Sequence, residues 1–173
     1  AGLAGYYVVV DPASEPLNLP SGPYDVPLCI QDKMLDENGS LIYPNMGINP
    51  EHPYWGPEFF GDIIMVNGKA WPYLDIEARK YRFRFLNGSQ ARFYSMRLED
   101  DQTGAAGPKF YQIATDGGYL PCAAILNNPA NPNSKRLLIA PGERCDVIVD
   151  FADVAPGTNL LLVNDANGPY PDG

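Results

Sequence analysis

Imidazole and thiolate groups are the side chains in this sequence that could hold a transition metal. The chain of 173 residues contains one histidine, His52, and three cysteines, Cys29, Cys122 and Cys145. A blue copper site requires two imidazoles and one thiolate in a trigonal set. If His52 combined with a cysteine and with Met46, the second imidazole would still be missing. The sequence therefore predicts no metal site within this chain.

The three cysteines are odd in number and widely spaced along the chain. They match neither a CxxC metal knuckle nor the framework of a small disulfide-stapled domain. We therefore expect buried free thiols, with a single disulfide as the alternative. Cys145 lies in an apolar strand pattern, where a thiol stays neutral and unreactive.

Arg144 is the charged residue whose position indicates a structural role. It follows Glu143 at the predicted start of a strand. We expect its guanidinium group to form a charge-assisted hydrogen bond with the carboxylate of Asp116 or Asp146, which would tie two turns together. The alternative is an arginine that orients an anionic substrate, but nothing nearby supplies an acid, a base or a nucleophile. No catalytic residue is predicted.

Three polar stretches have both a functional and a structural interpretation. The Asn-Gly-Ser sequences that begin at Asn38 and Asn87 fit the N-glycosylation pattern, but Asn-Gly is also a strong turn signal. The acidic run 99–101 could attract a divalent cation, although it has no fixed ligand spacing. We expect a turn at each of the three positions.

The composition indicates the elements that must position these residues. Eighteen prolines and 17 glycines interrupt helices often, whereas 45% hydrophobic residues supply a sizeable core. Tyr81, Phe83 and Phe85 alternate with Arg82 and Arg84, which predicts a strand with one aromatic and one basic face. The predicted strands are 25–31, 63–66, 71–76, 81–85, 94–98, 110–114, 119–126, 136–140, 145–151 and 159–164.

Short strands separated by turn signals predict an all-β sandwich or barrel with little helix. A further strand begins at Tyr6 and ends at Val10, and a proline-rich stretch follows it. We therefore divide the chain into a terminal strand with a linker, residues 1–23, and a self-contained domain, residues 24–173. Residues 44–61 contain four prolines and several aromatics, which predicts an irregular contact loop.

The charge balance excludes several classes of partner. Twelve basic and 21 acidic residues give a net charge of −9. Nucleic acids and anionic membranes repel such a chain. Its longest apolar runs are far shorter than the roughly 20 residues that cross a bilayer. We predict neither a nucleic-acid partner nor a membrane partner.

Six strings in order resemble the middle cupredoxin domain of three-domain multicopper oxidases of the bacterial laccase or bilirubin-oxidase type. They are AGLAGYYVVVD (1–11), YDVPLCIQD (24–32), GDIIMVNGKAWPYLDIEARKYRFRFLNGSQARFYSMRL (61–98), FYQIATDGGYLP (110–121), APGERCDVIVDF (140–151) and LLLVNDANGPYPDG (160–173). The resemblance implies a Greek-key β-sandwich or barrel of the cupredoxin type. Residues 1–23 would then end the preceding cupredoxin domain, and residues 24–173 would form a copper-free second domain. Cys145 stands where this family usually has tyrosine.

The resemblance also implies a function. The parent enzyme would hold four copper ions outside this chain, oxidise phenolic or related donors, and reduce dioxygen to water. This domain would orient the copper-bearing domains and contribute Asn167, Pro169 and Tyr170 to the wall of the donor pocket. The alternative for these three residues is an unstructured C-terminal end. We expect the chain alone to be inactive. A secreted, periplasmic or spore-associated parent is compatible with the resemblance.

Two other functions are alternatives to this one. An independent blue copper electron carrier would need a second histidine. A stand-alone β-sandwich could instead bind carbohydrate or protein through Tyr54, Trp55, Phe59 and Phe60. As part of an oxidase, the chain should contact the flanking copper-bearing domains, and the exposed strand 6–10 could also mediate self-association.

Overall fold

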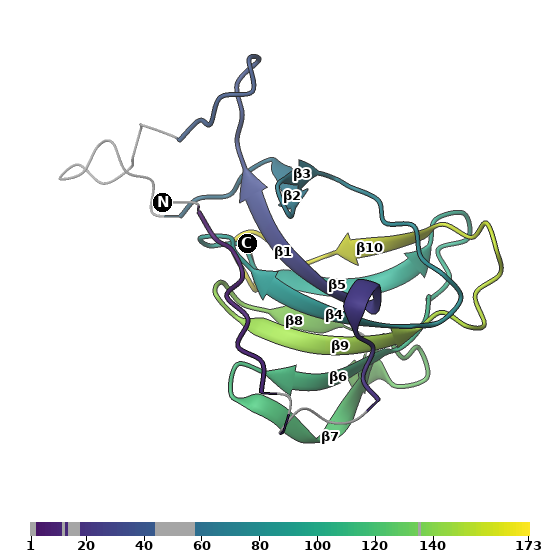
Figure 1. The fold of residues 1–173 in the computed structure, drawn as a ribbon. Coiled ribbons are helices and arrows are strands. Elements are labelled where there is room, and N and C mark those ends of the chain that lie inside the picture. The colour runs from purple at the N-terminus through teal and green to yellow at the C-terminus, as the bar shows by residue number, and fades with distance from the viewer. Residues whose placement is uncertain (1–2, 12, 14–17, 44–57, 135) are drawn as a thin grey trace.

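The computed structural model describes residues 3–11, 13, 18–43, 58–134 and 136–173. Within these residues the helical elements are two short 3-10 turns, η1 (Gly22–Tyr24) and η2 (Pro132–Ser134), and strands make up the rest of the regular structure. Figure 1 shows the strands gathered in two layers. The predicted all-β class is confirmed. No helix in the described part of the chain is long and apolar enough to cross a membrane.

The larger layer is a seven-stranded sheet with the order β3-β2-β1-β4-β9-β6-β7. Its strands are β1 (Asp25–Lys33), β2 (Ile63–Val66), β3 (Lys69–Ala70), β4 (Lys80–Asn87), β6 (Phe110–Thr115), β7 (Gly118–Leu126) and β9 (Arg144–Asp150). The pair β1 and β4 is parallel, whereas the other neighbours are antiparallel. The chain therefore completes the β2–β3 hairpin before it returns to the other side of β1.

The smaller layer is a three-stranded antiparallel sheet with the order β10-β5-β8. Its strands are β5 (Tyr94–Asp100), β8 (Leu137–Ile139) and β10 (Leu160–Asn164). Apart from the two stretches corrected below, every predicted strand is present, with bounds that differ by at most two residues.

The core lies between the two sheets and follows the predicted alternation. Tyr81, Phe83 and Phe85 of β4 point into it. Val147 and Val149 of β9 are fully buried beside them. Each such side chain contributes roughly 1.5 to 3 kcal/mol when it leaves water. The smaller sheet closes the core with Tyr94, Met96, Leu137 and Ile139.

The predicted strand 71–76 is wrong. The hairpin after β2 ends at Ala70, and residues 71–76 belong to no strand. Trp71 adopts a φ of 39°, in the left-handed region, which turns the chain away from the sheet. Pro72 has no N–H to donate to a continued ladder. The apolar residues of this stretch are consequently exposed.

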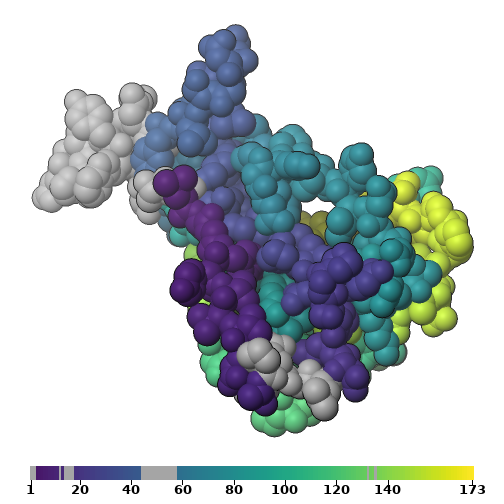
Figure 2. Space-filling view, viewed as in Figure 1, coloured from purple at the N-terminus to yellow at the C-terminus, as the bar shows by residue number. Residues whose placement is uncertain are grey.

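The predicted strand 6–10 is not formed within this chain, because residues 3–11 belong to no ladder here. The segment instead runs across the strand direction of the larger sheet, shown in purple in Figures 1 and 2. The hydroxyl of Tyr6 donates to the carbonyl of Arg84 in β4 and lies 3.4 Å from the carbonyl of Leu28 in β1. A chain that crosses the strands cannot align its own N–H and C=O groups with a sheet edge. Tyr7 and Val9 project into solvent, at 93% and 81% exposure.

The predicted contact loop 44–61 lies largely outside the described residues, and so do His52, Met46, Tyr54 and Trp55. The end of this loop is described from residue 58. The turn expected at Asn38 is present, since Gly39 N donates to Asp36 O at 2.9 Å.

Candidate functional site

The three residues predicted to line a pocket wall lie together in the segment that follows β10. The side-chain amide of Asn167 donates to the carbonyl of Pro171 at 2.8 Å. The carbonyl of Pro169 accepts from Gly173 N, also at 2.8 Å. The ring of Tyr170 stacks on Phe93, with centroids 4.7 Å apart and planes 16° apart. The segment is thus a folded loop attached to the sandwich.

Carboxylate and amide contacts secure the base of this loop. Asp165 accepts from Arg97 Nη1 at 2.7 Å and from Arg136 Nε at 2.7 Å. The hydrogen bond from Arg136 is the main reason why the pKa of Asp165 is lowered. Asn164 Oδ1 accepts from the backbone N–H of Ser95 at 2.8 Å. The loop therefore starts from a fixed point on β5 and β10.

A buried ion pair lies beside the same loop. Asp32 at the end of β1 is 3% exposed, and its Oδ2 accepts from Gly61 N at 2.7 Å and from Arg92 Nε at 3.1 Å. Arg92 Nη2 also donates to Gly61 O at 2.8 Å. Its guanidinium group lies 5.4 Å from the ring centre of Phe60. Oδ1 of Asp32 is the buried side-chain polar atom without a partner in the described part of the chain.

Sequence reasoning missed Asp32 and Arg92, although a signal for Asp32 was present. The alternation of β1 places Asp32 on the same inward face as Leu28 and Ile30, where a carboxylate is costly unless it is paired. An acid at that register indicates a buried cation nearby. Nothing local in the sequence identifies Arg92 as that cation, because 60 residues separate the two side chains.

Polar side chains also fix the turn between β4 and β5, which carries Arg92 and Phe93. The amide of Asn87 donates to the carbonyls of Arg92, at 2.8 Å, and Ile139, at 3.1 Å. Ser89 Oγ and the hydroxyl of Tyr94 lie 2.8 Å apart, and burial raises the pKa of Tyr94 to about 12. Asn87 is the last residue of β4 rather than part of the expected turn; its Oδ1 accepts from Ser89 N at 3.0 Å, and its buried side chain is engaged inside the protein.

The charged side chains of β4 lie on the outer face of the larger sheet. Arg84 forms two hydrogen bonds with Asp25, and Arg82 Nε donates to Asp146 Oδ2 at 2.9 Å. Arg82 is 3% exposed, and its Nη2 also donates to the hydroxyl of Tyr119 at 3.2 Å. This face is a network of ion pairs rather than a free basic surface.

Arg144 is joined to Asp116, one of the two carboxylates considered for it. Arg144 Nη1 lies 2.8 Å from Asp116 Oδ1, and the backbone N–H of Arg144 donates to the same oxygen at 3.0 Å. Asp146, the other candidate, pairs with Arg82. The Arg144 pair is about half exposed and ties the start of β9 to the turn between β6 and β7.

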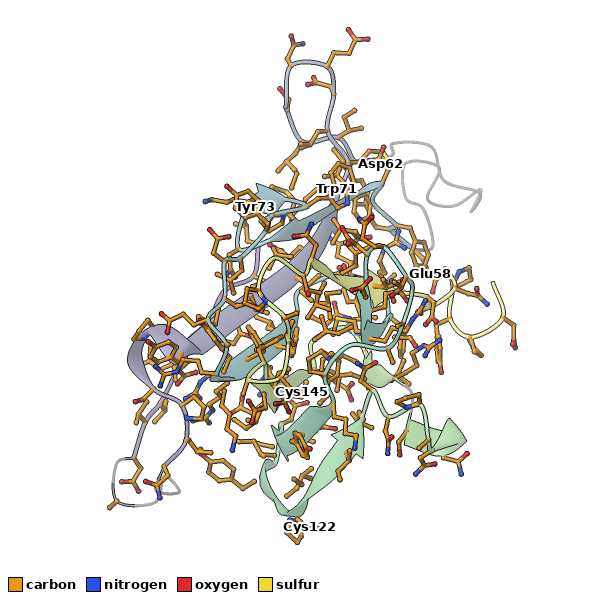
Figure 3. The ribbon with its side chains drawn as sticks, turned by 90° about the vertical axis from the view of Figure 1, so that its right-hand side faces the viewer. Glu58, Asp62, Trp71, Tyr73, Cys122 and Cys145 are labelled. Atoms are coloured by element: carbon orange, nitrogen blue, oxygen red, sulfur yellow. The ribbon has the colours of Figure 1, made fainter. Side chains whose placement is uncertain are left out.

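The cysteines are free thiols, as predicted, but they are not all buried. Cys29 and Cys145 are buried, whereas Cys122 on β7 is exposed. Figure 3 shows Cys145 inside the sandwich and Cys122 at one end of the molecule. Desolvation raises the pKa of Cys145, which keeps it as a neutral thiol.

The described residues do not fit a copper ion. Histidine is absent from the described ranges, since His52 falls in the gap from 44 to 57. No group of three or more histidine, cysteine, aspartate or glutamate side chains in those ranges could hold a metal. Cys29, Cys145 and Cys122 lie on β1, β9 and β7, and no two of these strands are neighbours in the larger sheet. The described side chains therefore do not supply the imidazole and thiolate ligands that a blue copper ion requires.

The stretch after β3 forms an exposed apolar surface. Trp71, Tyr73 and Leu74 are 67%, 89% and 52% exposed. Figure 3 shows Trp71 and Tyr73 in the upper part of the view, far from Cys122 at the bottom. A contiguous group of large exposed apolar side chains often marks a contact surface, whereas single exposed apolar side chains are common on any protein.

Comparison with known proteins places these features in context. A laccase from Bacillus subtilis (strain 168) is 44% identical over 170 residues, which cover 96% of this chain and 30% of the laccase. The multicopper oxidase LPR1 of Arabidopsis thaliana is 42% identical over 176 residues, which cover 100% of this chain and 28% of the relative. The chain thus spans about 30% of the length of these relatives. No protein-family model matches the sequence.

Solved structures agree with the sequence relatives. The crystal structure of the McoA multicopper oxidase from Aquifex aeolicus superposes with a TM-score of 0.69 and 38% identity. The superposition covers 86% of this chain and 28% of that protein. A laccase from Pediococcus acidilactici gives a TM-score of 0.62 at 29% identity.

Proposed function

Since this chain belongs to the multicopper oxidases, as a segment of one, we propose that it forms the middle cupredoxin domain of its parent and orients the copper-bearing domains on either side. The observation that carries the proposal is the match of 96% of the chain to 30% of a laccase.

The parent reaction that fits is oxidation of phenolic or related donors with reduction of dioxygen to water. Four one-electron oxidations supply the four electrons that one dioxygen molecule needs, together with four protons, to give two water molecules. Four copper ions in the flanking domains would carry this chemistry.

The exposed surface at Trp71, Tyr73 and Leu74 supports contact with the flanking domains. Domains within one chain bury part of their apolar surface against each other. A stretch that leaves its own sheet and presents three large apolar side chains is suited to such an interface. The N-terminal segment adds Tyr7 and Val9 to the apolar groups available for contact.

We assign Asn167, Pro169 and Tyr170 to the donor-side wall of the parent. Tyr170 is 40% exposed while one face of its ring is fixed on Phe93. An immobilised aromatic ring with an open side suits a planar aromatic donor. The neighbouring amide of Asn167 is already used within the loop, so the wall would be largely apolar.

The binding-module alternative has little support in the described residues. Phe59 stacks on Tyr43 with ring centres 5.6 Å apart, and Phe60 packs beneath Arg92. A carbohydrate platform needs ring faces that are free. Both described aromatics of the predicted set of four therefore serve internal contacts, and the other two lie outside the described residues.

Copper quantification and oxygen uptake test the proposal. The full-length parent should bind copper and consume oxygen with a phenol, whereas this chain, purified alone and reconstituted with copper, should hold well below one equivalent and consume none. A circular dichroism spectrum of β type controls for folding. Stoichiometric, blue-absorbing copper in the isolated chain would overturn the proposal.

A further inference from the structure

Two neighbouring residues between β4 and β5, Arg92 and Phe93, support the C-terminal loop, Phe93 directly and Arg92 through Phe60. Phe93 supports the ring of Tyr170 directly. Arg92 lies over Phe60, whose ring is in turn packed against the backbone of Gly168. The loop is therefore contacted at Tyr170 by Phe93 and at Gly168 by Phe60, and Arg92 packs over the ring of Phe60.

The contact at Gly168 is tight. A Cβ atom at this position would lie 3.2 Å from Cδ1 and 3.3 Å from Cε1 of Phe60. Such distances are tighter than about nine in ten real Cβ contacts, so with a side chain at this position the ring of Phe60 would have to shift by a few tenths of an ångström. The absence of a side chain at Gly168 allows the loop backbone to approach the aromatic ring.

Arg92 itself is held rigidly. Asp32, whose side chain is 0% exposed, accepts from Arg92 Nε. The carbonyl of Gly61 accepts from Arg92 Nη2 at 2.8 Å. Burying this carboxylate with Oδ1 unpartnered costs free energy that a purely apolar pair would not cost. A costly buried pair that fixes the orientation of a surface loop indicates a positioning role.

We propose that Arg92 and Phe93 form a clamp that positions the loop of residues 166–173, and that the clamp thereby controls how well a bulky aromatic donor fits the parent oxidase. The second half of this inference rests on the proposed role of Tyr170 in the donor-side wall. Arg92 and Phe93 are positioning residues, because they act through Tyr170 and Gly168.

The test uses the full-length parent oxidase with four single variants. Phe93→Ala removes the ring under Tyr170, and Arg92→Lys keeps the charge but loses the planar group over Phe60. Tyr170→Ala removes the wall residue itself. Arg79→Lys is the matched control, because Arg79 lies 3.5 Å above the ring of Tyr24 in a comparable contact elsewhere in the domain. Lysine at position 92 keeps a partner for the buried carboxylate and so protects folding.

Two measurements are made on each variant. Hydrogen exchange of the amides in 165–173 reports whether the loop is held. The KM and kcat for a bulky phenol and for a small phenol report donor fit. We expect Phe93→Ala to speed exchange of the loop about tenfold, in line with the loss of an aromatic pair. It should raise the KM of the bulky phenol roughly fivefold, with little change in kcat or in either constant for the small phenol.

The outcomes distinguish the positioning role of Arg92 and Phe93 from the role of Tyr170 in the donor-side wall. If Tyr170→Ala raises the KM of the bulky phenol while Phe93→Ala and Arg92→Lys change neither exchange nor KM, the clamp is overturned and the wall stands. If Phe93→Ala speeds loop exchange while Tyr170→Ala leaves KM unchanged, the wall is overturned and the positioning of the loop stands. Equal effects in Arg79→Lys and Arg92→Lys would also overturn the clamp, since the effect would not be local.

Discussion

Arg84 and Asp25 face each other through two parallel hydrogen bonds, from Nε to Oδ1 and from Nη2 to Oδ2, each 2.8 Å long. The pair joins β4 to β1, the parallel neighbours at the centre of the larger sheet. The hydrogen bond to Asp25 is the main reason why the pKa of Arg84 is raised. This two-point contact is stronger than a single surface ion pair and reinforces the pairing of two strands that are distant in sequence.

Asp25→Asn should lower the free energy of unfolding by about 2 kcal/mol. The substitution removes the two-point charged partner of Arg84, whose side chain is 17% exposed, and leaves only the 3.8 Å contact with Asp146. Urea denaturation of the parent domain measures the loss. Lys80→Gln is the control, because the Lys80–Asp150 pair is 3.7 Å apart and largely exposed, and it should change the free energy by less than about 1 kcal/mol. Equal losses in the two variants would contradict the prediction.

Tyr6→Phe should loosen the N-terminal segment and expose Cys29. The hydroxyl of Tyr6 anchors this segment to the carbonyl of Arg84, and the buried thiol of Cys29 belongs to the adjoining part of β1. Alkylation followed by peptide mass analysis measures the rate at each cysteine. The rate at Cys29 should rise several-fold, in line with a hydrogen bond worth about 1 kcal/mol. Exposed Cys122 is an internal reference whose rate should not change, and unchanged labelling of Cys29 would count against the anchor.

Gly61→Ala should destabilise the domain by about 3 kcal/mol or prevent its folding. A Cβ atom at Gly61 would overlap the backbone of Lys33, which cannot move without breaking the end of β1. Gly117→Ala is the matched control, because nothing lies within 4 Å of a Cβ atom built there. Thermal unfolding of both variants checks the prediction. A Gly61→Ala protein as stable as the control would show that this close approach is not required.

The ion pairs of Asp165 should make stability depend on pH in the acid range. The pKa of Asp165 is lowered in the folded chain, chiefly by its hydrogen bond from Arg136. The carboxylate therefore binds a proton more readily when unfolded, with a pKa of about 4. Its contribution is complete above that pH and is lost as the pH falls through the lower folded value.

Asp165→Asn removes this titration, so the variant should lose less stability than the unsubstituted protein when the pH falls below about 4. Denaturation midpoints measured from pH 7 downward test the expectation. Asp172→Asn serves as the control, since Asp172 is an exposed carboxylate near the C-terminus. If the unsubstituted protein and the Asp165→Asn variant lost stability equally as the pH falls, the proposed contribution of the ion pairs would be ruled out.

The alternation of side chains predicted the strands and the face of each strand that enters the core. Tyr81, Phe83 and Phe85 point inward and Arg82 and Arg84 outward, as the period of two requires. The same pattern failed at Trp71, where a left-handed backbone and a following proline end the hairpin. The local alternation of side chains shows which residues share a face of a strand. It does not show where the hydrogen-bonded pairing with the neighbouring strand ends.

The sequence by itself determined the all-β class, most strand positions, the inward aromatic face of β4 and the scarcity of imidazole. Only the tertiary structure placed Tyr6 across β1 and β4, paired Asp32 with Arg92, and stacked Tyr170 on Phe93. Strand patterns arise from neighbouring residues and can be recognised one segment at a time. The contacts of the loop and of the N-terminal segment join residues separated by tens of positions, and their geometry depends on how the two sheets pack.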